Sequence, residues 1–136
     1  MRRQSAKNRK REAAARPIRQ AMVAAAGKCE ICGTFPEKPK YRIPDLNLLC
    51  VHEIACGSAN RWKFLTAEFG TLVLCFYCNG EVVTDKSVWP EARQLALLKH
   101  RRPSQYDLVA YNHLYNPNAP RRIEQHEVDH FSSFLD

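Results

Sequence analysis

Two short stretches, Cys29-Glu-Ile-Cys32 and Cys75-Phe-Tyr-Cys78, decide how this chain is organised. Each is a C-x2-C pair, and 42 residues separate the first pair from the second. Four thiolates at this spacing are typical of a tetrahedral zinc site, which ties together segments that are far apart in the sequence. We therefore predict a structural Zn²⁺ ion held by Cys29, Cys32, Cys75 and Cys78.

The other two cysteines, Cys50 and Cys56, lie between these pairs. Six cysteines in a secreted chain would suggest disulfides, but this N-terminus is too charged to contain the apolar region of a secretory signal. C-x2-C pairs without such a signal point to metal thiolates in a reducing compartment. We expect Cys50 and Cys56 to be small buried thiols flanking a strand, although either could replace one of the four ligands.

Length and composition limit the class of protein. A chain of 136 residues with 45% apolar content is expected to form one domain with a modest core. No run approaches the roughly eighteen uncharged apolar residues that a membrane span requires. We therefore expect a soluble, cytoplasmic protein without a membrane partner.

The net charge of +7 is concentrated at the N-terminus. Residues 1–28 hold nine Lys or Arg against Glu12 alone, a net charge of +8, so the other 108 residues sum to −1. Such an arm attracts DNA or RNA by neutralising phosphates and releasing counterions, and a solubilising tail without a partner is the alternative. The residues predicted to contact nucleic acid here are Arg2, Arg3, Lys7, Arg9, Lys10, Arg11, Arg16 and Arg19.

Helix formers and chain breakers predict an α+β fold in three segments. The arm (1–28) is expected to hold one helix over 5–15 and another from Pro17 to Gly27. The zinc core (29–84) is expected to contain strands over 46–54 and 71–75, a loop over 57–70 and a short helix after Asn79. The C-terminal extension (85–136) is expected to be helical, with helices beginning near Pro90 and Ser104 and a last one bearing Ile123, Val128, Phe131 and Leu135.

Three motifs between and beside the cysteines carry further information. They are Val51-His-Glu-Ile54, Gly57-Ser-Ala-Asn-Arg61 and Leu72-Val-Leu-Cys-Phe-Tyr-Cys-Asn79. A strand with a histidine, a loop with an asparagine and a helix that begins just after C-x2-C resemble the HNH, or ββα-metal, endonuclease family. The resemblance covers about residues 29–84 and is closest to small phage-type members. It implies a ββα-metal core, a nuclease or nickase that hydrolyses DNA, and the cytoplasm of a bacterial or phage-infected cell.

The resemblance also implies roles for individual residues, in an H-N-N variant of the motif. In the family, one divalent ion, commonly Mg²⁺ or a transition metal, is held by the first residue of a histidine pair and by the His or Asn that opens the helix. By position, His52 and Asn79 would hold this ion, and Asn60 would fix the loop and orient the base. Arg61 is a candidate phosphate contact.

Glu53 departs from the family pattern, because it occupies the position of the histidine that activates water. A carboxylate with a reference pKa of about 4.3 accepts protons less readily at pH 7 than imidazole at about 6.5. Glu53 could be the base or a ligand, His52 could instead be the base, or the site could bind without turnover. Because adjacent strand residues point to opposite faces, His52 and Glu53 converge on one ion only if the strand bulges or ends there.

Two other signals compete with this interpretation. His126-Glu-Val-Asp-His130 matches the H-E-x-x-H zincin signature, but it lies six residues from the C-terminus with little chain around it, so a chance match is favoured. Trp62, Phe64 and Phe69 could stack on bases or form a small core around the zinc.

The alternative function is a zinc-stabilised module that binds DNA, RNA or a larger nucleoprotein assembly without catalysis. In this case the arm would act together with two basic pairs, Arg101-Arg102 and Arg121-Arg122.

Overall fold

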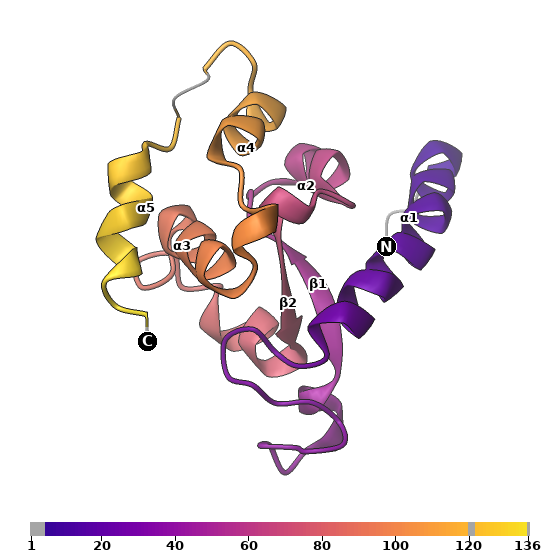
Figure 1. The fold of residues 1–136 in the computed structure, drawn as a ribbon. Coiled ribbons are helices and arrows are strands. Elements are labelled where there is room, and N and C mark those ends of the chain that lie inside the picture. The colour runs from indigo at the N-terminus through magenta and orange to yellow at the C-terminus, as the bar shows by residue number, and fades with distance from the viewer. Residues whose placement is uncertain (1–4, 120–121, 136) are drawn as a thin grey trace.

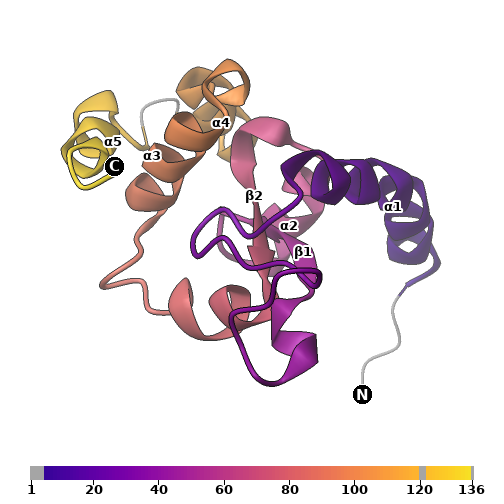
Figure 2. The ribbon, with the colours of Figure 1, turned by 60° about the horizontal axis from the view of Figure 1, so that its bottom comes forward.

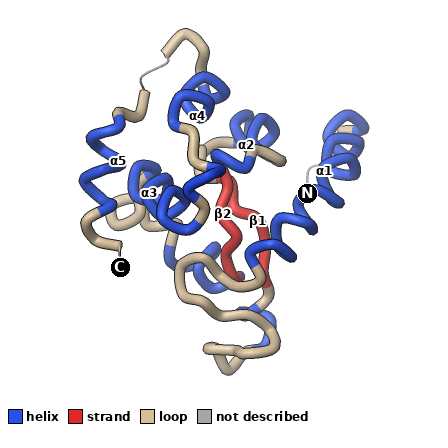
Figure 3. The backbone as a smooth tube through the Cα atoms, in the orientation of Figure 1, coloured by secondary structure: helices blue, strands red, loops and turns tan. Residues whose placement is uncertain are grey.

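A computed structural model describes residues 5–119 and 122–135 of the chain. It is a mixed α+β structure with a small antiparallel sheet surrounded by helices (Figures 1 and 3). The α+β prediction is confirmed. In chain order the helices and strands are α1 (Ala6–Ala26), a 3₁₀ turn (Pro44–Asn47), β1 (Leu49–Glu53), α2 (Ser58–Phe64), a 3₁₀ turn (Glu68–Gly70), β2 (Thr71–Cys75), a π-helical turn (Cys78–Val82), α3 (Glu91–Arg101), a 3₁₀ turn (Pro103–Gln105), α4 (Leu108–Tyr115) and α5 (Gln125–Ser132).

The described part of the basic arm contains one continuous helix, α1, and not the two that were predicted. Pro17 lies inside α1 and has no N–H to donate to the Ala13 carbonyl. Both residues are exposed, so water can bind that carbonyl instead. Ser5 caps the start of α1, and Gly27 ends it at φ 73°, donating its N–H to the Val23 carbonyl. The N-terminal half of α1 projects beyond the sheet in both views (Figures 1 and 2).

The sheet in the described part of the chain consists of β1 and β2. Val51 lies opposite Val73, and His52 lies opposite Leu72. β2 was predicted with its observed bounds, whereas β1 is shorter than the predicted 46–54 because the 3₁₀ turn that starts at Pro44 occupies the preceding residues.

Charged side chains bind the outer backbone edges of both strands at the paired residues Val51 and Val73. Arg19 of α1 donates to the Val51 carbonyl at 2.9 Å. Glu30 accepts from the Val73 N–H at 2.7 Å, and its own N–H donates to the Val73 carbonyl at 2.9 Å. Since these backbone groups would otherwise remain unpaired, the first cysteine pair and the arm helix both close the sheet.

The core lies between β2 and the C-terminal helices. Leu72 and Leu74 of β2 are fully buried, and α3 contributes Leu95 and Leu98, all at 0% exposure. α3 begins just after Pro90, as predicted, and α5 packs against it. The predicted cap Ser104 instead lies in a 3₁₀ turn, and α4 is capped by the Asp107 side chain, which accepts from the Ala110 N–H.

The predicted loop over 57–70 is partly helical. Residues 58–64 form α2, and Phe64 at its end is buried against Tyr111 of α4, with ring centroids 5.1 Å apart. Phe64 also contacts Phe69 edge-on at 6.4 Å. Both phenylalanines therefore belong to the packing of the core, while Trp62 is half-buried beside α1 with the Arg61 guanidinium over its ring.

Candidate metal centre and polar site

The four predicted cysteine ligands meet at one point. The sulfur atoms of Cys29, Cys32, Cys75 and Cys78 all lie within 4.8 Å of one another, and the Cys32 and Cys75 sulfurs are 3.7 Å apart. A tetrahedral Zn²⁺ with Zn–S bonds of about 2.3 Å requires S···S separations of about 3.8 Å. The donor set therefore fits zinc. It is the one group of three or more metal-binding side chains within residues 5–119 and 122–135.

Backbone geometry positions each cysteine pair. The first pair bends in a turn in which Gly33, at φ 83°, donates its N–H to the Cys29 carbonyl at 2.9 Å. The second pair lies where β2 passes directly into a helix, so that the Cys78 N–H points at the Cys75 sulfur at 3.4 Å. A strand end and a tight turn thus supply two thiols each.

The thiols perturb one another strongly. A hydrogen bond from Cys78 is the main cause that lowers the pKa of Cys29 to about 4, whereas burial raises the pKa of Cys75 to about 11. Four thiols crowded into one cluster therefore cannot all ionise without a large electrostatic cost. A bound cation would remove this conflict, because it stabilises every thiolate.

Asn47 organises the proline-rich loop beside the cysteines, a role that the sequence does not predict. Its fully buried side chain accepts from the Thr34 hydroxyl at 2.7 Å and from the Tyr41 N–H at 3.0 Å, and its amide donates to the Tyr41 carbonyl at 3.0 Å. An asparagine close to prolines usually indicates a turn, so sequence pattern alone does not single it out.

The Asn79 side chain lies close enough to His52 to influence its pKa. His52 projects from β1 toward α3, where its Nε2 lies 2.8 Å from Oε1 of Gln94. Burial lowers the pKa of His52, while its hydrogen bond to the Gln94 oxygen and the nearby Asn79 side chain partly oppose this effect. Asn79 is the second residue of a π-helical turn rather than the first residue of a helix. The pair forms a largely buried polar site with a neutral imidazole.

Glu53 lies on the other face of the strand. Its carboxylate is 3.2 Å from Nη1 of Arg19 and 3.6 Å from Nε of Arg61, with 13% of the side chain exposed. β1 neither bulges nor ends before Glu53, so ordinary alternation separates it from His52. The structure therefore does not bring Glu53 to the His52–Asn79 pair.

Asn60 lies in α2, away from these contacts. Its amide donates to the Cys56 carbonyl at 2.7 Å, which braces the turn at Gly57. Cys56 is exposed, while the Cys50 thiol is half-buried and donates to the Leu74 carbonyl at 3.5 Å. Neither cysteine belongs to the four-sulfur cluster.

No family model, curated protein or solved structure matches this chain. In the described part of the chain, no helix combines the length and apolar character needed to cross a membrane.

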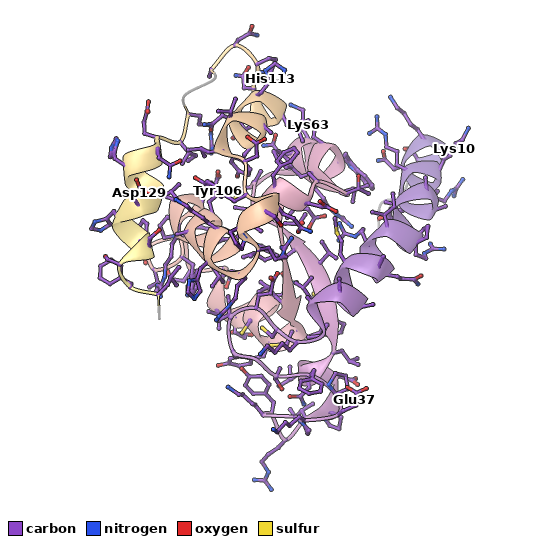
Figure 4. The ribbon with its side chains drawn as sticks, in the orientation of Figure 1. Lys10, Glu37, Lys63, Tyr106, His113 and Asp129 are labelled. Carbon is purple, nitrogen blue, oxygen red and sulfur yellow. The ribbon has the colours of Figure 1, made fainter. Side chains whose placement is uncertain are left out.

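The basic residues fall into two groups. Arg19 and Arg61 are engaged within the protein, through Glu53 and, for Arg61, also through Glu12 at 3.3 Å. Arg2 and Arg3 lie outside the described residues. Figure 4 shows Lys10 on the part of α1 that points away from the sheet. The exposed basic residues of α1 are Lys7, Arg9, Lys10, Arg11 and Arg16.

The other predicted basic patches are largely internal contacts. Arg102 pairs with buried Glu30 at 2.9 Å, and Arg101 donates to the Glu30 carbonyl at 2.9 Å. Arg122 forms an ion pair with Glu91 and lies over the Tyr115 ring. Arg121 is outside the described residues. These arginines attach α3 and the chain before α5 to their neighbours.

The H-E-x-x-H motif has a structural explanation. Its glutamate, Glu127, accepts from the Glu124 N–H in a capping box that starts α5, and Val128 is buried in the core. His126 and His130 are exposed, and no third ligand joins them among the described residues. The motif is therefore accounted for by helix capping and packing.

Proposed function

We propose that this chain is a metal-dependent endonuclease or nickase of the HNH, or ββα-metal, type that hydrolyses DNA phosphodiester bonds. The observation that carries the proposal is the approach of Asn79 to His52, two residues that lie 27 positions apart and are joined through the cysteine cluster and the sheet. Strand, strand and helical turn follow one another around a site that fits zinc, in the order that the family motif requires.

His52 and Asn79 would hold the divalent ion, which supplies charge stabilisation at the scissile phosphate and leaving oxygen. Burial keeps the imidazole neutral near pH 7, so one ring nitrogen can ligate or can accept a proton from water. Glu53 is oriented toward Arg19 and Arg61, which favours His52 over Glu53 for the chemistry.

Plasmid nicking with Mg²⁺, with Mn²⁺ and with no added divalent ion tests this proposal on zinc-loaded protein. We expect His52→Ala and Asn79→Ala to lower the rate by at least about 100-fold while zinc content and cooperative unfolding are retained. His52→Ala should melt at a lower temperature, because the buried Gln94 amide loses a hydrogen-bond partner. High Mn²⁺ should partly restore His52→Ala if the imidazole is a ligand, but not if it accepts the proton. Undiminished cutting by His52→Ala would refute the proposal.

Glu53→Gln is the matched control, since it alters the neighbouring residue on the opposite face. Loss of the carboxylate weakens its contacts with Arg19 and Arg61, so stability should fall while nicking persists. Abolished nicking by a folded Glu53→Gln protein would instead assign catalysis to the carboxylate.

A nucleic-acid-binding module without hydrolysis is the second candidate. The exposed positive charge of α1 favours this candidate. The catalytic divalent ion would also have only two proposed protein ligands, His52 and Asn79, which favours binding without hydrolysis. Its partner would be DNA, RNA or a larger nucleoprotein assembly. Absence of nicking together with salt-sensitive binding would select this candidate.

The contribution of α1 can be measured by fluorescence anisotropy with a DNA duplex and an RNA duplex at several salt concentrations. Each phosphate contact removed should reduce the slope of log K against log[salt] by about 0.9 on B-DNA. We expect this for Arg9→Gln and Lys10→Gln, with Lys99→Gln on α3 as the control. Unchanged slopes would exclude the arm as a binding surface.

A further inference from the structure

Gln94 is a fully buried amide on α3 that contacts the proposed site. It is 0% exposed, and the other buried residues of α3 are apolar. Its Oε1 lies 2.8 Å from Nε2 of His52, and its Nε2 donates to the Trp89 carbonyl at 3.0 Å. A buried amide is costly unless both ends are paired, and here both are.

The Trp89 carbonyl determines which way this amide points. A carbonyl oxygen only accepts hydrogen bonds, so the group facing it must be the NH₂ end of Gln94. The oxygen of Gln94 then faces the imidazole and also only accepts. The His52 nitrogen at 2.8 Å must therefore carry a proton, because two acceptors would repel each other at that distance.

We propose that Gln94 is a positioning residue that holds neutral His52 as the Nε2–H tautomer and leaves the Nδ1 lone pair for the site. The catalytic consequence rests on the proposed function, but the tautomer itself does not. Nδ1 is then the atom that ligates the ion or accepts the proton. Gln94 belongs to the C-terminal extension, so the extension completes a site whose other members lie in the zinc core.

Imidazole ¹⁵N–¹H correlation spectra test the tautomer without substrate. Zinc-loaded protein is measured at pH 8 without added Mg²⁺, above the ordinary histidine pKa of about 6.5, and His52→Ala identifies the His52 signals. We expect the Nε2–H pattern in the wild type and a mixture of tautomers in Gln94→Met. An Nδ1–H pattern in the wild type would overturn the proposal without any variant, as would an unaltered Nε2–H pattern in folded Gln94→Met.

Gln94→Glu separates positioning from mere packing. In its neutral form, which burial favours, the glutamic acid can donate to the Trp89 carbonyl and still accept from Nε2–H. This variant should therefore keep the tautomer and nick faster than Gln94→Met, which should lose roughly 10- to 100-fold. If Gln94 only filled space, the apolar variant would be the better tolerated of the two, and that order would overturn the proposal. Gln125→Met, an exposed position on α5, is the control and should match the wild type.

The two proposals fail in distinguishable ways. If the wild type shows the Nε2–H tautomer but nicks no DNA, the positioning role stands and the nuclease proposal falls. If the wild type nicks DNA while Gln94→Met keeps both its tautomer and its rate, the nuclease proposal stands and the positioning role falls.

Discussion

Gly70 precedes β2 at a point where no side chain fits. A Cβ atom at this position would lie 2.4 Å from Cδ1 of Phe64 and 3.4 Å from Cδ2 of Tyr111. Both rings are buried, so neither can move without disturbing the core. Because Gly70 has no side chain, the junction between the 3₁₀ turn and β2 can pack closely against the rings of Phe64 and Tyr111.

Gly70→Ala should therefore reduce the free energy of unfolding by about 1–3 kcal/mol, because a ring must leave its place. Urea denaturation measures this change. Gly80→Ala is the matched control, since a Cβ there meets nothing within 4 Å, and it should be neutral or slightly stabilising. Equal effects of the two substitutions would contradict the packing argument.

The two cysteines outside the cluster should differ in reactivity. Burial raises the pKa of Cys50 to about 11, and the thiolate is the reactive form, so alkylation of Cys50 should be slow at pH 8 and accelerate as the pH rises toward 11. Cys56 is exposed. Peptide mass spectrometry of zinc-loaded protein treated with iodoacetamide should show Cys56 modified first. Earlier modification of Cys50 would contradict its placement.

At the scale of elements, α3 is attached to the zinc region by one ion pair. Arg102 at the end of α3 contacts both carboxylate oxygens of Glu30, at 2.9 and 3.1 Å, and also donates to the Thr71 carbonyl at 2.7 Å. Glu30 in turn caps the edge of β2 through Val73. The pair thus links the first cysteine turn, the sheet edge and the C-terminal helices.

Removing one partner of this buried pair should be costly. Arg102→Met leaves the Glu30 carboxylate without its counter-charge and should destabilise the protein by about 3–5 kcal/mol. Lys99→Met on the same helix breaks an exposed pair with Asp129 at 3.6 Å and should cost less than about 1 kcal/mol. Thermal denaturation of both variants tests the difference, and similar losses would argue against a structural role for Glu30–Arg102.

At the scale of the whole molecule, the four sulfurs connect the end of the arm, the sheet and the helical turn that bears Asn79. If zinc binds there, its binding free energy is part of the folding free energy. We expect one zinc per chain by atomic emission and loss of both metal and cooperative unfolding in Cys75→Ser. Cys56→Ser, which alters an exposed cysteine, should retain both. Full zinc content and an unchanged melting temperature in Cys75→Ser would refute the assignment.

The sequence predicted the meeting of the four cysteines, the bounds of β2 and the start of α3, because each depends on local chemistry. Thiol pairs with two residues between them converge on one ion, an unbroken run of apolar and β-branched residues predicts a buried strand, and Pro90 presets the first helical turn. The alternation of a strand also predicted that His52 and Glu53 would separate unless the strand bulged.

Long-range partners required the tertiary structure. Sequence pattern did not indicate that Gln94 would meet His52, that Glu30 would meet Arg102, or that Arg19 and Arg61 would bind Glu53 rather than remain free. The continuity of α1 through Pro17 was not predicted, because a proline locally favours a break in the helix. The formation of α2 also depends on its surroundings, since residues 58–64 carry no strong local helix signal. Local propensity acts over a few residues, whereas the pairing of buried polar groups is decided by which elements the packed core brings together.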